Sequence, residues 1–116
     1  MRSHRAKDSP WVEGDGYRKR VIVPPEALGT SVLVQEVSFR EGDTMPSHYH
    51  RRTTELFIPI SEGEIRIDGE DVPLTKGTII QCEPGDVHGI PKVERDFSIL
   101  VVKVDAERDD TIWCDE

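Results

Sequence analysis

The sequence predicts an all-β protein, folded as a sandwich or a small barrel, and three observations support this class. Short runs rich in β-branched and aromatic residues recur at intervals of about ten residues between residues 21 and 104. Glycine and proline stand between these runs, where the chain must turn. No stretch has a convincing helical period, and residues 24–29 could hold one short helical turn at most. Many short strands separated by turns are typical of antiparallel sandwiches and small barrels.

The expected strands follow one another in a regular order. Residues 32–39 are rich in β-formers and end at the turn signal of residues 41–43. Residues 65–68 alternate between apolar and polar types and meet Asp68-Gly69, a dipeptide that favours a hairpin turn. Pro73 suits an edge strand, because proline cannot donate a hydrogen bond to a neighbouring strand. The other expected strands are 56–60, 72–74, 78–82, a strand that carries His88, and 98–104.

The run at residues 56–60 is apolar on both faces. In a barrel whose outer face meets water, alternate positions should be polar. We therefore expect the outer face of this strand to be covered by the segment 21–23, by a second subunit, or by both.

Length and charge restrict the classes of function. A chain of 116 residues is expected to form one domain, here a barrel over residues 21–104 between a partly flexible N-terminal extension, 1–20, and an acidic C-terminal tail, 105–116. The formal net charge of −8 argues against nucleic acid as a partner, because such binding needs a positive surface. No apolar run is long enough to span a membrane, so no membrane partner is expected.

Two features predict a cytoplasmic location. The N-terminus lacks the apolar segment of a signal peptide. Cys82 and Cys114 are only two and lie far apart, which favours free thiols in a reducing compartment over a disulfide.

Three of the four histidines and one glutamate form the pattern that says most about function. Side chains alternate along a strand, so His48 and His50 point to one side. Glu55 lies an odd number of residues further on, and the polar stretch 51–54 must bend to bring it back to that side. His88 must arrive from a distant strand. Zn, Fe, Mn and Ni sites recruit imidazole and carboxylate ligands, and the set favours a metal site over histidines with ordinary hydrogen bonds.

These residues stand in two motifs that resemble those of the cupin superfamily, over about residues 30–104. In the first motif, Gly42 is followed by five residues, then by His48-Tyr49-His50, by four residues and by Glu55. The closing glycine, Gly63, comes one residue later than in the family. The extra residue, near Pro59, predicts a β-bulge.

In the second motif, Gly77 is followed by five residues, then by Glu83-Pro84-Gly85 and by His88. Glu83 stands where the family usually has proline, and Lys92 stands where it has asparagine. These departures affect turn positions and leave the ligand positions intact.

The resemblance implies a small jelly-roll β-barrel, also called a double-stranded β-helix. It also implies one divalent transition metal, Zn, Fe, Mn or Ni, held by His48, His50, Glu55 and His88. The resemblance to small proteins of this family also implies a homodimer, which fits the strand at residues 56–60 that is apolar on both faces. The family includes dioxygenases, isomerases, decarboxylases, lyases and binding modules, so its fold does not define a reaction.

We therefore expect a metal-dependent enzyme that acts on a small organic molecule. The alternatives are a non-catalytic module that binds or senses a small ligand, and a protein whose metal is purely structural. No catalytic residue is assigned. Arg51 and Arg52 follow the first histidine pair and would suit an anionic substrate, although a solvated loop is the simpler interpretation. The remaining candidates for substrate contact, each of which could instead serve packing, are Tyr49, Phe57, Met45 and Cys82.

Overall fold

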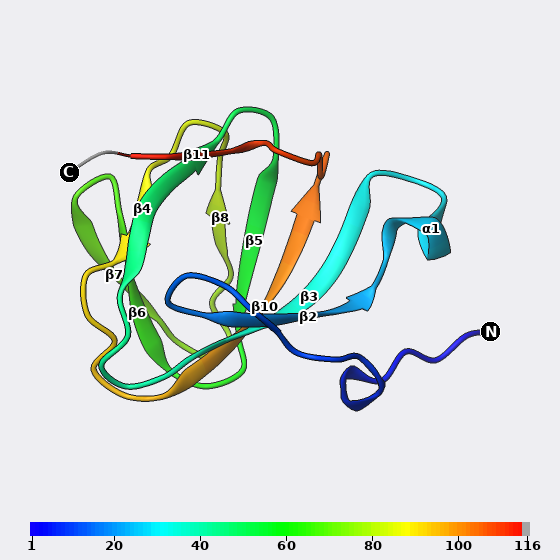
Figure 1. Cartoon of the computed structure of the whole chain (residues 1–116), viewed down its shortest axis with the longest axis horizontal. Coiled ribbons are helices and arrows are strands. Elements are labelled where there is room, and N and C mark those ends of the chain that lie inside the picture. Colours follow the sequence, from blue (N-terminus) through cyan, green and yellow to red (C-terminus); the bar gives the residue numbers. More distant parts are fainter. Residues whose placement is uncertain (115–116) are drawn as a thin grey trace.

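The computed structural model describes residues 1–114 and confirms the all-β prediction. Two antiparallel sheets face each other and form a small jelly-roll β-barrel (Figure 1). In spatial order, the first sheet contains β1 (Val12–Glu13), β2 (Arg18–Val23), β3 (Val32–Phe39), β10 (Phe97–Val104), β5 (Thr54–Pro59) and β8 (Ile80–Cys82). The second contains β11 (Thr111–Trp113), β4 (Met45–His50), β9 (His88–Ile90), β6 (Gly63–Ile67) and β7 (Glu70–Leu74). The helical elements among these residues are the 3₁₀ turn η1 (Ala6–Asp8) and α1 (Pro25–Leu28).

The long pairing of β3 with β10 organises the first sheet. It runs in one register from Phe39 opposite Phe97 to Val32 opposite Val104. The Phe39 and Phe97 rings stack with their centroids 4.7 Å apart and close one end of the core. The inward positions of both sheets fill the space between them, which is the expected consequence of the two-residue period of a strand. The most deeply buried side chains are Ile65, Leu74, Ile99 and Val93.

The turns form where the sequence predicts them. Asp68 and Gly69, with φ angles of 49° and 82°, join β6 to β7, and β7 carries Pro73 at the edge of its sheet. The extra residue of the first motif is accommodated directly after Pro59. There the N–H groups of Ile60 and Ser61 both donate to Ser98 O, at 3.0 and 3.1 Å, so two residues oppose one, as in a β-bulge.

The N-terminal segment extends the first sheet at its edge. β2 pairs with β3, and β3 and β10 separate it from β5. Residues 21–23 therefore do not cover the outer face of β5, where Leu56 and Ile58 remain half-buried. The expectation that residues 21–23 of the same chain cover this face is therefore wrong.

The C-terminal segment contains a strand that the sequence did not predict. β11, drawn in red in Figure 1, pairs with β4 and places Thr111 opposite His50 and Trp113 opposite His48. The last two residues of the predicted acidic tail, Asp115 and Glu116, lie outside the described residues. Cys82 and Cys114 are both free. Within residues 1–114, no helix has the length and apolar character needed to cross a membrane.

Candidate metal centre

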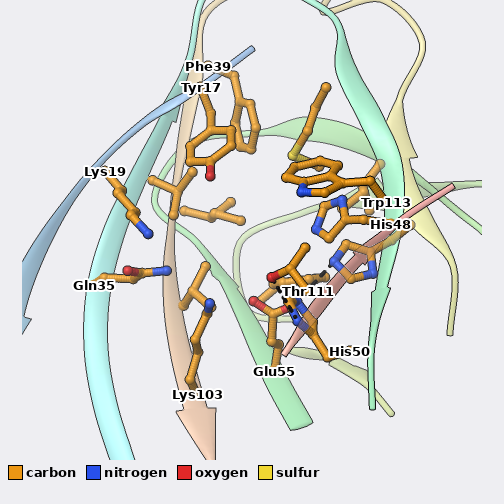
Figure 2. Close-up of a pocket in the computed structure, with 17 residues that line it drawn as sticks. Tyr17, Lys19, Gln35, Phe39, His48, His50, Glu55, Lys103, Thr111 and Trp113 are labelled. Atoms are coloured by element: carbon orange, nitrogen blue, oxygen red, sulfur yellow. Dashed lines mark hydrogen bonds and ion pairs between the residues drawn. The ribbon is translucent and has the colours of Figure 1, made fainter. Parts of the chain in front are cut away.

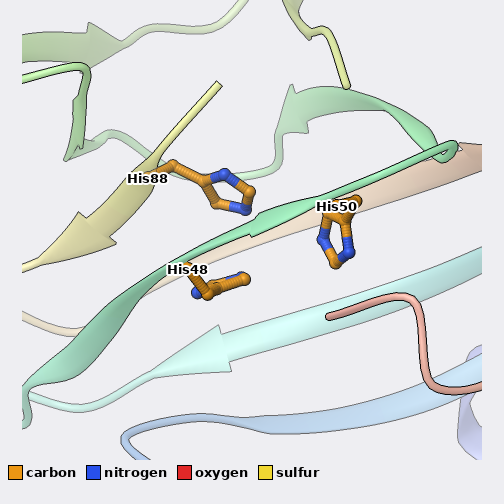
Figure 3. Close-up of side chains that lie close together, drawn as sticks. All are labelled: His48, His50 and His88. Carbon is orange, nitrogen blue, oxygen red and sulfur yellow. The ribbon is translucent and has the colours of Figure 1, made fainter. Parts of the chain in front are cut away.

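Three buried histidines converge between the two sheets (Figure 3). His48 and His50 project from β4, and His88 projects from β9, where its Cα is paired with that of His48. Each ring offers one nitrogen, and these nitrogens lie within 4.8 Å of one another. The side chains are only 3–7% exposed, so water does not compete freely for them.

Close backbone packing allows the strands to bring these rings together. A side chain at Gly89 would press on Met45 O and on the backbone of Ser47, at 3.0 Å. The register of β4 against β9 also shifts between Met45 and His48. Glycine next to His88 is therefore required by the tight approach of β9 to β4.

The outer ring nitrogens of the three histidines are held by other groups. His48 Nδ1 lies 3.0 Å from Pro46 O, and His88 Nδ1 lies 3.1 Å from Asp86 O. A carbonyl oxygen only accepts, so both Nδ1 atoms carry hydrogen, and in the neutral ring Nε2 keeps its lone pair. His50 Nδ1 lies 3.4 Å from Thr111 Oγ1 of β11. Such contacts orient histidine rings in metal sites and select the nitrogen that binds.

Glu55 completes the group, because the polar stretch after β4 makes the bend that the sequence predicts. Its Oε1 lies 2.9 Å from His50 Nε2 and 3.2 Å from His88 Nε2. Asp110 stabilises the bend: its carboxylate accepts the backbone N–H groups of residues 51, 52 and 53 at 2.9–3.1 Å. The structure thus brings all four predicted ligands together.

The neutral ring of His48 and the ionised carboxylate of Glu55 are in the forms that bind a cation, whereas His88 must lose a proton to do so. Burial lowers the pKa of His48 to about 4, assisted by the neighbouring charge of His88. Burial alone would also lower the pKa of His88, but contacts with Cys82 and Glu55 raise it to about 10. Burial would raise the pKa of Glu55, yet His50, His88 and Lys103 hold it below its usual value.

One contact in the group lacks the geometry of a hydrogen bond. His50 Nε2 and Glu55 Oε1 are close, but neither atom has a hydrogen-bond partner among the described residues. Buried polar atoms without partners are costly unless something binds them. A metal ion between the imidazoles and the carboxylate would satisfy both atoms, so the residues present fit the metal that the resemblance implies.

The group opens onto a cavity of about 100 Å³ between the sheets (Figure 2). Met45 and Phe57, both predicted as substrate contacts, line it, together with the side chains of β11. The opposite wall carries Tyr17, Lys19, Gln35 and Lys103, which the sequence analysis missed.

A signal for two of these missed residues was present. Gln35 alternates with the inward residues Val37 and Phe39, and Lys103 alternates in the same way with Ile99 and Val101. Polar side chains at inward positions of otherwise apolar strands mark a cavity wall.

The other predicted contacts do not line this cavity. Arg51 and Arg52 are exposed on the loop after β4, and Arg52 pairs with Glu107 at 3.1 Å. Tyr49 points to the opposite face of β4 and is half-buried. Cys82 lies behind His88, with Sγ 3.4 Å from His88 Nδ1.

Comparisons with known proteins show that other proteins share this fold. The polyketide cyclase RemF from Streptomyces resistomycificus matches with a TM-score of 0.81 and 17% identity, over 100% of this chain and 87% of that chain. A Streptomyces PAC13 variant with uridine matches with a TM-score of 0.75 and 17% identity, over 99% of this chain and 92% of that chain. A protein described as a predicted oxalate decarboxylase from Thermotoga maritima matches with a TM-score of 0.76 and 18% identity, over 89% of this chain and 98% of that chain.

At these identities the likeness concerns the fold. No curated protein sequence matches this chain. The cupin domain model matches residues 35–103, which is more than half of the chain and includes both histidine motifs. The chain therefore belongs to the cupin domain family.

Proposed function

We propose that this protein is a metal-dependent enzyme that acts on a small organic molecule bound inside the barrel. One observation carries the proposal: three oriented, buried imidazoles and one carboxylate form the inner wall of a cavity. His48, His50, Glu55 and His88 would hold one divalent transition metal, Zn, Fe, Mn or Ni. When bound, such an ion supplies Lewis acidity that polarises an oxygen of the substrate.

The cavity favours this function over a purely structural metal. A structural site is closed by its protein ligands, whereas this group borders a space large enough for several atoms of a ligand. Similar folds carry different reactions: PAC13 is described as a nucleoside dehydratase, and RemF as a polyketide cyclase. These descriptions support a small organic substrate without selecting a reaction.

Metal content tests the ligand assignment. Natively purified protein should contain about one equivalent of a transition metal, and His50→Ala should lose most of it and melt at a lower temperature, because ion binding is linked to folding. His4→Ala is the matched control, since His4 is exposed in the N-terminal segment. Metal stoichiometry that stays unchanged in His50→Ala would contradict the assignment.

Cobalt substitution separates the three functional alternatives. An open site should change its visible spectrum when azide or imidazole is added, and a closed structural site should not. Turnover of a candidate substrate that needs both the metal and His50 would favour the enzyme. Saturable binding without turnover across a broad substrate panel would favour the binding module.

We also propose that the protein acts as a homodimer. The outward side chains Leu56 and Ile58 of β5 adjoin Leu100 and Val102 of β10, and together they form an apolar surface on the first sheet. A second copy packed on this sheet would remove that surface from water. Light scattering should give a dimer mass for the wild type and a monomer for Ile58→Glu, with Leu28→Glu on α1 as the control. A monomeric wild type would refute the proposal.

A further inference from the structure

The cavity wall opposite the histidines is built from hydrogen-bond donors. Lys19 comes from β2, Gln35 from β3 and Lys103 from β10, and Tyr17 lies directly before β2. Figure 2 shows Lys19, Gln35 and Lys103 on one side of the cavity, with His48 and His50 on the other. Three strands of the first sheet thus present a polar wall to the candidate metal group of the second.

Among residues 1–114, these donors have no hydrogen-bond or ion-pair partner. Gln35 is only 5% exposed, yet its side-chain amide forms no hydrogen bond with any residue from 1 to 114. Across the same range, neither Lys19 nor Lys103 has a carboxylate within ion-pair distance. An amide that lines the cavity without a protein partner can donate a hydrogen bond to a ligand there.

The carboxylate of Glu55 compensates the charges on this wall only in part. Among the described residues, Glu55 is the single acidic residue that lines the cavity, and its Oε1 faces His50 and His88. Burial lowers the pKa of Lys19, and the ammonium of Lys103 adds to the effect through repulsion. Two cations held near each other favour an anion between or beside them.

This positive wall is a local property, since the whole chain carries a net charge of −8. A cavity of one sign in a protein of the opposite sign focuses the electric field and selects a charged ligand. The phenol of Tyr17 remains a donor, because burial and the charges of Asp15 and Glu55 raise its pKa. The wall thus offers two ammonium groups, one amide and one hydroxyl, which suits the roughly four acceptor positions of a carboxylate.

We infer that the substrate is a small organic acid whose carboxylate is bound by Lys19, Lys103 and Gln35, with its reactive end directed toward His48, His50 and His88. The inference rests on the proposed function and names its substrate class. It assigns anion recognition to lysines inside the barrel, whereas Arg51 and Arg52 lie on an exposed loop outside the cavity.

Calorimetric titration of the metal-loaded full chain tests the inference. The probes are lactate and malonate, each compared with its neutral amide, and inorganic phosphate as a different anion. Each acid should bind at least about tenfold more tightly than its amide, because charged hydrogen bonds contribute more than neutral ones. Added sodium chloride should weaken the binding of the acids and leave the binding of the amides nearly unchanged.

Two double variants locate the effect. Lys19→Met with Lys103→Met should weaken acid binding by about tenfold or more and leave amide binding unchanged. Lys7→Met with Lys76→Met removes the same charge from exposed positions outside the cavity and should bind the acids like the wild type. Metal content, measured on every sample, reports separately on the proposed function.

Several outcomes would overturn the inference. It fails if no acid binds the metal-loaded wild type more tightly than its amide, a result that needs no variant to fold. It also fails if the Lys19 and Lys103 variant, loaded with metal, binds acids as the wild type does. If phosphate binds more tightly than both carboxylates, the site recognises phosphorylated ligands and not carboxylic acids. A wild type that holds no metal would instead refute the proposed function.

Discussion

Replacing Asp110 should destabilise the loop that carries Glu55 into the site. The Asp110 side chain is buried, with 7% exposure, and its carboxylate accepts three successive backbone N–H groups, those of residues 51, 52 and 53. Asp110→Ala leaves these donors without a charged acceptor. Water can reach the exposed residues Arg51 and Arg52, whereas Thr53 is only 3% exposed, so its N–H would stay unsatisfied.

The magnitude follows from the pKa of Asp110. Burial by itself would raise it, but the N–H groups of Arg52, Thr53 and Arg51 lower it from 3.8 to about 2. At about 1.4 kcal/mol per pKa unit, the ionised carboxylate stabilises the folded protein by about 2.5 kcal/mol at neutral pH. Loss of one buried and two solvated hydrogen bonds leads to a similar value, about 2–3 kcal/mol.

Urea unfolding of the metal-free protein measures this free energy at a series of pH values. A lowered carboxyl pKa stabilises the fold above the unfolded value of 3.8, and the contribution is lost as pH falls through about 2. The difference between wild type and Asp110→Ala should therefore be about 2.5 kcal/mol at pH 6 and should largely disappear by pH 2.

The control is Glu107→Ala, which removes an exposed ion pair with Arg52 and should cost under about 0.5 kcal/mol. If Asp110→Ala costs no more than this control, or if its cost does not change with pH, the reasoning about the carboxylate is wrong.

Three further predictions concern the site and its supports. At pH 7, metal binding to the metal-free protein should release about one proton, because His88 has a pKa of about 10 and its ring is protonated before the metal binds. Calorimetric titrations in buffers of different ionisation enthalpy will count the released protons. Zero release would contradict a protonated His88 in the metal-free protein. Trp113→Ala should speed metal loss to a chelator severalfold, because the indole, 4.7 Å from His48, covers the cavity; an unchanged rate would exclude this role. Gly16→Ala should lower the free energy of unfolding by more than about 2 kcal/mol, because a Cβ at this position would overlap Thr44 O. Gly29→Ala is also at positive φ but in open space, and it should cost about 1 kcal/mol. Equal costs for the two variants would contradict the packing argument.

Local patterns in the sequence predict most of the barrel. The residues from 32 to 39 form a strand because their alternation matches the pleat, and the turn at Asp68-Gly69 forms because both residues tolerate positive φ. The ligand group was equally predictable, because His48 and His50 share a strand face by spacing alone. The strand, the turn and the histidine pair depend on residues that lie close together in the chain, whereas His88 comes from a distant strand and was assigned through the resemblance to the cupin motifs.

The tertiary structure decided what depends on contacts between distant segments. β11 contains only three residues and is a weak strand by itself. It forms because Asp110, directly before it, binds the backbone of the loop after β4, and because Thr111 contacts His50 on β4. The polar wall opposite the histidines arises from three strands that become neighbours only when the sheet assembles.

By itself, therefore, the sequence determined an all-β fold through its strand period, and the resemblance of its two motifs to those of cupins implied the barrel and its four candidate ligands. Only the tertiary structure decided that Lys19 and Lys103 face the cavity while Arg51 and Arg52 remain outside it. The physical reason is that the two-residue repeat of a strand decides which face a side chain lies on. Which residues that face meets depends on the pairing and packing of distant segments.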